Sequence, residues 1–320
     1  MDINTNRLRL VFMGTPLFAV PSLEAVIENA NVVGVVTQPD RTSGRRRQLN
    51  PPPVKLCAVE EGIEVYQPDS ISHPDTIDKI RDVSPELIVV VAYGAILDRS
   101  LLELPALGCI NIHPSLLPCY RGPCPVEWAI MKGETVTGVS CIYMDEKMDT
   151  GDIIAQRRLE IAPFDTAGSL NEKLAGLGAK ILEEVLSDFG KGKVKRTPQR
   201  GKVSYAPFIK KEDCCVNWER PPLEIHNFVR ALNPNIGARA CLPDGGNKLI
   251  IWETASLPQA EDVSTAMPGE VLRVLEDAIV VAAGGGAILV KTVQPEGGVR
   301  QTAAEYIRGH HLEKFGGSVI

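Results

Sequence analysis

The 320-residue sequence has no apolar run long enough to span a membrane. Its first residues, Met1–Arg7, lack the basic-then-apolar pattern of a secretory signal peptide. Its eight cysteines are scattered, without the spacing of a disulfide framework or of a zinc ribbon. We therefore expect free thiols, no metal site, and a protein of the reducing cytoplasm that has no contact with a membrane.

An excess of positive charge is missing as well. The chain has 34 basic and 40 acidic residues, so its net charge is −6, and a polyanionic partner would have to bind a local basic patch. The first strand-to-helix turn, Gly14-Thr-Pro16, is not a Gly-x-Gly-x-x-Gly sequence, which argues against a dinucleotide site there. Hydrophobic residues make up 44% of the chain, the ordinary share for a globular protein, and its length is enough for two domains.

The first part of the chain alternates short apolar runs with amphipathic segments. Strands are expected at 8–13, 31–37, 64–66, 87–92 and 109–112. Helices are expected between them, at 18–29, 54–61 and 74–83. This order predicts βαβ units, and hence an α/β fold with a Rossmann-like, mostly parallel sheet. A long amphipathic helix at 169–189 would close a first domain at 1–189.

The pattern changes after this helix. Residues 190–203 are rich in Lys and Arg and contain no acid, and we expect a basic linker at 190–206. This linker is either a solvated tether or a second phosphate contact. Beyond it, short β-rich runs separated by Gly, Pro and Asp predict a small OB-like β-barrel domain at 207–320.

Polar residues at the end of the strand at 109–112 form a pattern that indicates chemistry. Asn111 and His113 are two residues apart, so an extended chain points them to the same side. Pro114 restricts His113 to extended geometry. A Pro-rich loop with Tyr120 and Arg121 follows, an elaborate path for a simple connection. Alone, the pair fits a capped strand end as well as a ligand site.

A second turn supplies a carboxylate. Asp149-Thr-Gly-Asp152 lies between expected strands at 137–143 and 153–161, and its turn sequence would expose Asp149 at a loop tip. An amide, an imidazole and a carboxylate suit transfer to or from a carbonyl carbon. The amide holds the carbonyl oxygen, the imidazolium stabilises the developing oxyanion, and the carboxylate orients the imidazole and keeps it charged. No Ser or Cys is needed as a covalent nucleophile.

Two further segments are candidates for binding. Residues 38–53 are too long and too polar for a simple connection, and they hold four arginines. These arginines are Arg41, Arg45, Arg46 and Arg47. Flexible arginines suit a polyanion backbone, although a solvated loop explains the composition equally well. Ile96 and Leu97 follow the strand at 87–92, at the sheet edge where ligands bind, and would wall an apolar pocket unless they only pack in the core.

Taken together, these residues resemble the methionyl-tRNA formyltransferase family over nearly the whole chain. The shared sequences are Gly14-Thr-Pro16, Thr37-Gln-Pro-Asp-Arg41, Val90-Val-Ala-Tyr-Gly94, Asn111-Ile-His113, Ser115-Leu-Leu-Pro118, Arg121-Gly122 and Asp149-Thr-Gly-Asp152. Asn-x-His, Ser-Leu-Leu-Pro and Asp-Thr-Gly are common to folate-dependent formyltransferases of this fold. The Thr-Gln-Pro-Asp-Arg loop and the barrel indicate the tRNA-directed members.

The resemblance implies formyl transfer from 10-formyltetrahydrofolate to the α-amino group of methionyl initiator tRNA, by a monomer without a metal. It assigns catalysis to Asn111, His113 and Asp149. It assigns folate binding to Ser115, Leu116, Leu117 and Pro118, beside the apolar wall of Ile96 and Leu97. It places Arg45 in an insertion loop that enters the acceptor stem. The basic residues expected to contact tRNA are Arg41, Arg45, Arg46, Arg47, Lys193, Lys195 and Arg196.

The sequence departs from the family pattern at two places. Pro123-Cys124 replaces small residues after Arg121-Gly122, which would reshape the pocket edge, and Asn233-Pro-Asn-Ile lacks the usual Trp-Pro, which affects one corner of the barrel. Two alternative functions fit the sequence less well. A formyltransferase for glycinamide ribonucleotide or an amino sugar nucleotide would need neither the arginine loop nor the barrel. A noncatalytic tRNA-binding protein would need no Asn, His and Asp trio.

Overall fold

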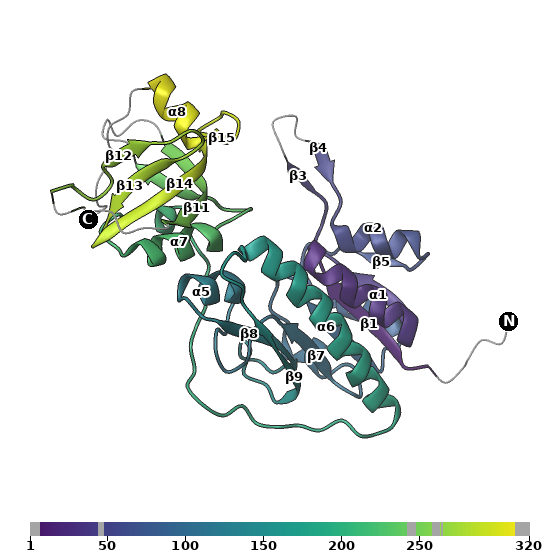
Figure 1. The fold of residues 1–320 in the computed structure, drawn as a ribbon. Helices are drawn as coiled ribbons and strands as arrows, with labels where there is room; N and C mark the ends of the chain where they lie inside the picture. Colours follow the sequence, from purple (N-terminus) through teal and green to yellow (C-terminus); the bar gives the residue numbers. More distant parts are fainter. Residues whose placement is uncertain (1–6, 44–47, 242–247, 258–262, 264, 311–320) are drawn as a thin grey trace. The chain divides into compact units, whose positions relative to one another are not determined.

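The structure is a computed structural model that describes residues 7–43, 48–241, 248–257, 263 and 265–310 (Figure 1). Contacts divide the chain into two compact units. The first unit comprises 1–125, 136–160 and 171–206, and the second comprises 126–135, 161–170 and 207–320. The units therefore interleave in sequence, and the basic segment at 190–206 groups with the first unit rather than standing apart from both.

The first unit is built on a seven-stranded sheet with the order β5-β2-β1-β6-β7-β8-β9. Its strands are β1 (Arg9–Gly14), β2 (Asn31–Val36), β5 (Val65–Tyr66), β6 (Leu87–Val91), β7 (Cys109–His113), β8 (Val136–Tyr143) and β9 (Ile153–Glu160). Pairing from β5 to β7 is parallel, whereas β8 and β9 are antiparallel. Every residue of β6 is buried, as expected for a central parallel strand that is covered on both faces.

Helices connect the parallel strands. They are η1 (Leu17–Ala19), α1 (Val20–Asn29), α2 (Pro53–Glu60), α3 (Pro74–Asp82) and the single turn α4 (Arg99–Leu102). Two further helices lie outside the parallel part, α5 (Pro125–Met131) between β7 and β8 and α6 (Ala167–Gly190) after β9. Proline occupies the first turn of α1, α2 and α3, where a backbone N–H would have no acceptor within the helix. None of the helices in the described ranges is long and apolar enough to cross a membrane.

The arginine-bearing segment after β2 is not a plain loop in its described part. Strands β3 (Arg41–Ser43) and β4 (Gln48–Asn50) pair antiparallel as a two-stranded hairpin. Arg41 begins β3 and is exposed. The expected tRNA contacts Arg45, Arg46 and Arg47 lie outside the described residues. Three-residue strands are too short to leave a periodic pattern, which is why the sequence did not reveal the hairpin.

The second unit has a six-stranded antiparallel sheet. Its strands are β10 (Ala238–Cys241), β11 (Lys248–Ser256), β12 (Val271–Val274), β13 (Ile279–Ala283), β14 (Gly286–Pro295) and β15 (Gln301–Thr302). The path is β10-β11-β14-β13-β12, and β15 pairs with β14. Its helices are η2 (Glu212–Cys214), α7 (Pro222–Ala231) and α8 (Ala303–His310). A mostly parallel sheet followed by an antiparallel one confirms the expected fold class.

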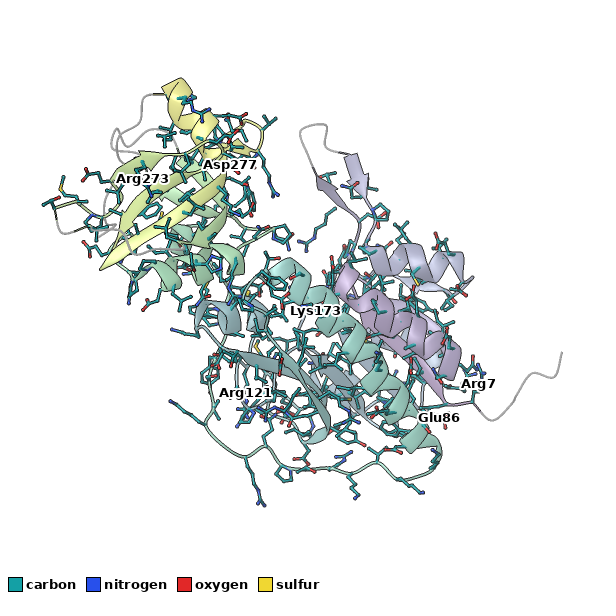
Figure 2. The ribbon with its side chains drawn as sticks, in the orientation of Figure 1. Arg7, Glu86, Arg121, Lys173, Arg273 and Asp277 are labelled. Atoms are coloured by element: carbon teal, nitrogen blue, oxygen red, sulfur yellow. The ribbon has the colours of Figure 1, made fainter. Side chains whose placement is uncertain are left out.

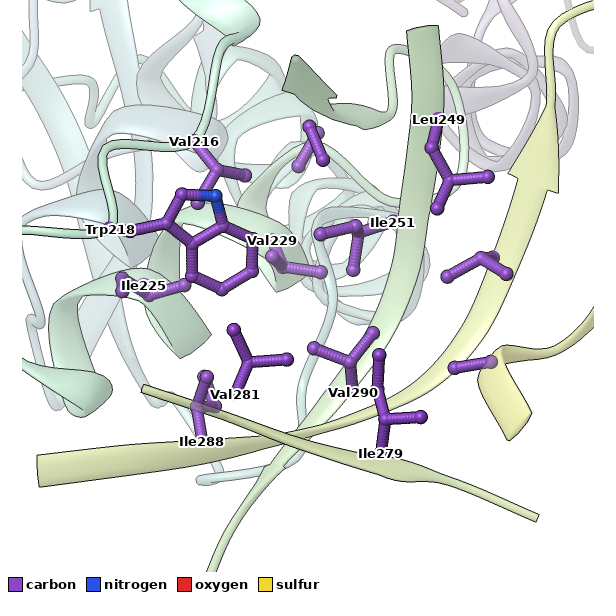
Figure 3. Packing of buried hydrophobic residues seen from close by; sticks show 14 of the residues in the cluster. Val216, Trp218, Ile225, Val229, Leu249, Ile251, Ile279, Val281, Ile288 and Val290 are labelled. Carbon is purple, nitrogen blue, oxygen red and sulfur yellow. The ribbon is translucent and has the colours of Figure 1, made fainter. Parts of the chain in front are cut away.

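The core of the second unit surrounds Trp218, which is 2% exposed and packs among branched side chains of the sheet and of α7 (Figure 3). Ile236, in the corner where the family pattern has Trp-Pro, is partly buried against this core. Asn233 Nδ2 donates to Trp252 O at 2.7 Å. A Cβ at Gly237 would lie 2.5 Å from Ile250 Cγ2, so a side chain there would press against the side chains of Ile250 and Trp252. The corner is thus packed with an isoleucine instead.

Candidate functional site

Strand β7 presents Asn111 and His113 at the carboxyl edge of the parallel sheet. Asn111 pairs with Val90 of β6 and with Ile142 of β8, and His113 pairs with Ser140 of β8. Because Asn111 and His113 are two residues apart on one strand, they face the same side. His113 is 4% exposed, and Asn111 is half-buried. The expected amide and imidazole are therefore held side by side.

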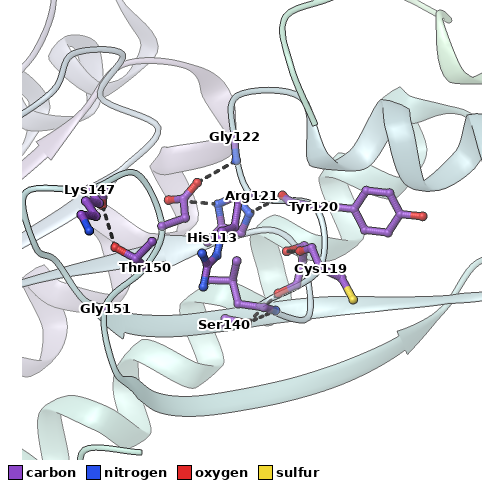
Figure 4. Close-up of polar contacts among 12 residues, drawn as sticks. His113, Cys119, Tyr120, Arg121, Gly122, Ser140, Lys147, Thr150 and Gly151 are labelled. Carbon is purple, nitrogen blue, oxygen red and sulfur yellow. Dashed lines mark hydrogen bonds and ion pairs between the residues drawn. The ribbon is translucent and has the colours of Figure 1, made fainter. Parts of the chain in front are cut away.

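The two nitrogens of the His113 ring face different groups. Nε2 lies 3.0 Å from Tyr120 O, and since a carbonyl oxygen can only accept, Nε2 must carry a proton (Figure 4). Nδ1 lies 3.7 Å from Asp149 Oδ1, an ion-pair distance that is too long for a hydrogen bond. The ring is thus fixed at one end by a backbone carbonyl and faces a carboxylate at the other.

Asp149 points inward rather than being exposed as the turn sequence suggested. Its side chain is only 12% exposed. Oδ2 accepts a hydrogen bond from the backbone N–H of Gly122 at 2.8 Å. The backbone of Asp149 has φ +56°, a left-handed conformation that Asp tolerates better than most residues. Next to it, a Cβ on Gly151 would lie 1.8 Å from Tyr143 O, so only glycine fits in this turn.

The segment assigned to folate, Ser115–Pro118, is fixed by polar contacts beneath it. Ser140 Oγ donates to Ser115 O at 2.6 Å and accepts from Leu117 N at 3.1 Å. Gln156 Nε2 donates to Leu117 O at 2.9 Å. Ser115 Oγ donates to Cys119 O, and its side chain is fully buried. The hydroxyl of Ser115 therefore shapes the loop instead of facing a ligand.

The remaining members of this segment and the expected apolar wall differ in exposure. Leu117 and Pro118 are buried, whereas Leu116 is half-buried. Leu97 is 2% exposed and belongs to the core cluster of the sheet. Ile96 is 73% exposed. Of the two wall residues, only Ile96 presents apolar surface beyond the end of β6.

The basic residues expected to contact tRNA are exposed wherever they are described. Lys193 and Lys195 lie after α6 on exposed backbone. Arg196 is exposed overall, but its guanidinium stacks on the Tyr143 ring at 3.7 Å from the ring centroid. Arg196 therefore already has a packing role in the first unit.

The two cysteines buried in the strands beside the site, on β7 and β8, are unsuited to covalent chemistry. Burial raises the pKa of the Cys109 thiol to about 12, and burial also raises the pKa of Cys141 on the neighbouring strand. Protonated thiols are poor nucleophiles at neutral pH. Within the described ranges, no cluster of His, Cys, Asp and Glu is arranged to hold a metal. The site thus offers hydrogen-bond donors and one carboxylate, which suits direct transfer of a carbonyl group.

Sequence reasoning missed Gln199 and the close fit of Gly122. Gln199 lies on the basic linker and donates to the carbonyl oxygens of Asp149 and Gly151. Gly122 has φ +119°, and a Cβ there would lie 2.7 Å from Ala206 O. The Gly in the Arg-Gly pair was a signal for a tight backbone approach, but nothing in the sequence indicated what approaches it.

A site that suits carbonyl transfer at the carboxyl edge of such a sheet is compatible with a formyltransferase. A family model described as formyl transferase matches residues 8–186, and one described as formyl transferase, C-terminal domain, matches residues 208–311. The chain is 45% identical over 308 residues to the methionyl-tRNA formyltransferase of Geobacter sulfurreducens, covering 96% of this chain and 95% of that protein. The chain belongs to the methionyl-tRNA formyltransferase family.

Other comparisons agree. The methionyl-tRNA formyltransferase of Acetivibrio thermocellus is 43% identical, with 95% of this chain and 97% of that protein covered. Among solved structures, the sugar 3N-formyl transferase WlaRD has a TM-score of 0.65 at 19% identity, covering 89% of this chain and 97% of that one. HypX from Aquifex aeolicus, in complex with tetrahydrofolic acid, has a TM-score of 0.63 at 21% identity, covering 95% of this chain but only 47% of that one. These structural matches show the fold alone.

Proposed function

We propose that the protein transfers the formyl group of 10-formyltetrahydrofolate to the α-amino group of methionyl initiator tRNA, for translation initiation. The observation that carries this proposal is the buried His113 and Asp149 pair beside Asn111, in a chain whose named relatives match it over nearly its full length. The partners are the folate and the charged tRNA, and we expect a cytoplasmic monomer.

In the proposed mechanism, the neutral amine attacks the formyl carbon, a new C–N bond forms, and the bond from that carbon to the folate nitrogen breaks. The formyl oxygen carries negative charge in between. The Asn111 amide and the Nε2–H of His113 donate to this oxygen, so Nε2–H must be shared with Tyr120 O or turned away from it. Asp149 faces the other ring nitrogen, and it takes the proton that the amine loses and returns it to the leaving nitrogen, directly or through water.

Folate is proposed to lie along Ser115–Pro118, whose backbone Ser140 and Gln156 hold in place. The exposed apolar side chain of Ile96 would complete this surface. Ile96→Asp should therefore raise the KM for folate with little effect on kcat. Leu97→Asp is not a usable test, because Leu97 is core and its replacement by a charge would unfold the chain.

The arginine hairpin and the basic linker are proposed to bind the acceptor stem. Each phosphate contact contributes about 0.7–0.9 units to the log–log salt slope. Replacing Arg45, Arg46 and Arg47 together by Ala should weaken tRNA affinity and flatten this slope, while folate binding stays unchanged. A chain with Lys79→Ala, Lys173→Ala and Lys180→Ala, three exposed lysines on α3 and α6, is the control for the loss of three charges. An unchanged slope in the triple variant would indicate that the arginine segment is only a solvated loop. A small acceptor, such as glycinamide ribonucleotide or an amino sugar nucleotide, would then again be a candidate substrate.

The decisive experiment compares acceptors at equal enzyme concentration. Formyl transfer should proceed with charged initiator tRNA and not with glycinamide ribonucleotide or an amino sugar nucleotide. His113→Ala and Asn111→Ala should each lower turnover by about 10²- to 10³-fold and leave tRNA affinity near that of the parent chain. Transfer to a small acceptor alone would overturn the proposed substrate, and near-normal turnover of folded His113→Ala would overturn the assigned site.

A further inference from the structure

The basic linker does not run free of the first unit. Thr197 exchanges two backbone hydrogen bonds with Ile153 of β9, at 2.8 and 2.9 Å. Further along, Ser204 O accepts from Arg121 N at 2.9 Å, and Ala206 N donates to Arg121 O at 2.7 Å. The Ser204 hydroxyl accepts from Tyr120 N at 2.9 Å. The linker is therefore paired with the loop at 120–122. In the same loop, Tyr120 O contacts the His113 ring and Gly122 N–H donates to the Asp149 carboxylate.

Gln199 lies between these two anchor points and touches both loops of the site. Its Nε2 donates to Asp149 O and to Gly151 O, each at 2.9 Å. Its Oε1 accepts from Arg121 Nη2 at 2.6 Å. Arg121 projects from the loop that follows β7 (Figure 2). Both N–H donors and the oxygen of this half-buried side chain are thus bonded to residues next to the buried His and Asp pair.

We propose that Gln199 is a positioning residue for formyl transfer, which fixes the turn that carries Asp149 against the loop that carries Arg121 and Gly122. This inference rests on the proposed function for its kinetic consequence only. Its structural part concerns the turn itself and holds whatever the acceptor is.

The physical reason lies in the conformation of the turn. A left-handed backbone at a non-glycine residue costs of order 1–3 kcal/mol and persists only when surrounding contacts impose it. Asp149 has φ +56°, and the Gln199 amide binds its carbonyl oxygen directly. The carboxylate of the same residue must stay within reach of Gly122 N–H and of the His113 ring. Releasing the backbone would therefore let the carboxylate drift, and a displacement of about 1 Å costs up to about 100-fold in rate.

Two substitutions separate the two ends of the side chain. Gln199→Met keeps the length and removes both the donors and the acceptor. Gln199→Glu keeps an acceptor for Arg121 and loses the two donors to the turn. Thr197→Ala is the control, because the Thr197 side chain is exposed and only its backbone pairs with β9. We expect both Gln199 variants to lose kcat by up to about 100-fold, with KM for folate and for tRNA near the parent values.

Two readouts distinguish positioning from general destabilisation. Backbone amides of residues 144–152 should exchange with deuterium faster in both Gln199 variants than in Thr197→Ala, a measurement that needs no acceptor. In an Asp149→Asn background, Gln199→Met should have little further effect on kcat, because the carboxylate that it positions is gone. Parent-like exchange and parent-like kcat in Gln199→Glu would overturn the proposal, as would full additivity with Asp149→Asn. If the parent chain fails to formylate charged tRNA, the proposed function fails, and the exchange measurement still decides the role of Gln199.

Discussion

Gly122→Ala measures how closely the linker is packed against the loop of the site. The backbone at Gly122 has φ +119°, and an added Cβ would lie 2.7 Å from Ala206 O, closer than real Cβ atoms come to a backbone atom. Gly201, which lies on the linker itself, is a matched control. Its φ is +114°, but an added Cβ would meet only Pro118 Cγ, at an ordinary 4.0 Å. The two substitutions thus share the same unfavourable φ and differ in the close approach.

The expected magnitudes follow from these two terms. Alanine at such a φ costs about 1–3 kcal/mol, and this should be the whole effect of Gly201→Ala. Gly122→Ala carries the same cost plus overpacking against a backbone carbonyl, about 1–3 kcal/mol more. In a domain of about 150–250 residues, each kcal/mol lowers the melting temperature by about 2–4 °C. Gly122→Ala should therefore melt on the order of 5 °C below Gly201→Ala.

Thermal or urea unfolding, followed for both variants and the parent chain, gives these differences directly. Formyl transfer supplies a second comparison, because Gly122 N–H is the donor to the Asp149 carboxylate and its displacement should lower kcat. Equal stability of the two variants would refute the reasoning, since it would mean that the Ala206 carbonyl does not press on Gly122. The linker would then pack less closely against Gly122 than this geometry indicates.

Three further outcomes are expected. Asp149→Asn keeps an oxygen for the Gly122 N–H, so its melting temperature should hold while kcat falls by about 10²- to 10⁴-fold in the transfer assay. Burial lowers the pKa of His226 from its ordinary 6.5, so below about pH 6.5 the unfolded chain binds a proton that the folded chain does not. The free energy of unfolding, measured at several pH values, should therefore fall as the pH drops below about 6.5, and it should fall less in His226→Gln. Arg196→Ala should lower the free energy of unfolding in urea by about 0.5–1 kcal/mol, because the guanidinium no longer stacks on Tyr143. The same substitution should not change it in a Tyr143→Leu background.

The sequence predicts those parts of the fold that repeat a local pattern. The fully apolar run at Leu87–Val91 is a central strand, because only burial on both faces explains five such residues in succession. Asn111 and His113 share a face because a strand alternates sides, whatever surrounds it. These inferences needed no knowledge of other chain segments.

Such local patterns do not predict long-range contacts between backbone atoms. The bonds that join Arg121 to Ser204 and Ala206 cross more than 80 residues and use main-chain atoms that every residue has. Burial of Leu97 illustrates the same limit, since a leucine at a strand end packs in a core or lines a pocket with equal ease. The inward turn of Asp149 depends on the Gly122 N–H, which comes from another loop.

The linker is proposed to have two functions, and a single scan of mutations would confuse them. Lys193, Lys195 and Lys202 are exposed cations that suit a phosphate backbone, and Gln199 between them holds the turn of Asp149. A linker variant with low turnover therefore does not by itself reveal a tRNA contact. Charge loss should raise the KM for tRNA and flatten its salt dependence, whereas loss of Gln199 should lower kcat at any salt concentration. Measuring both quantities for each variant assigns every linker residue to binding or to positioning.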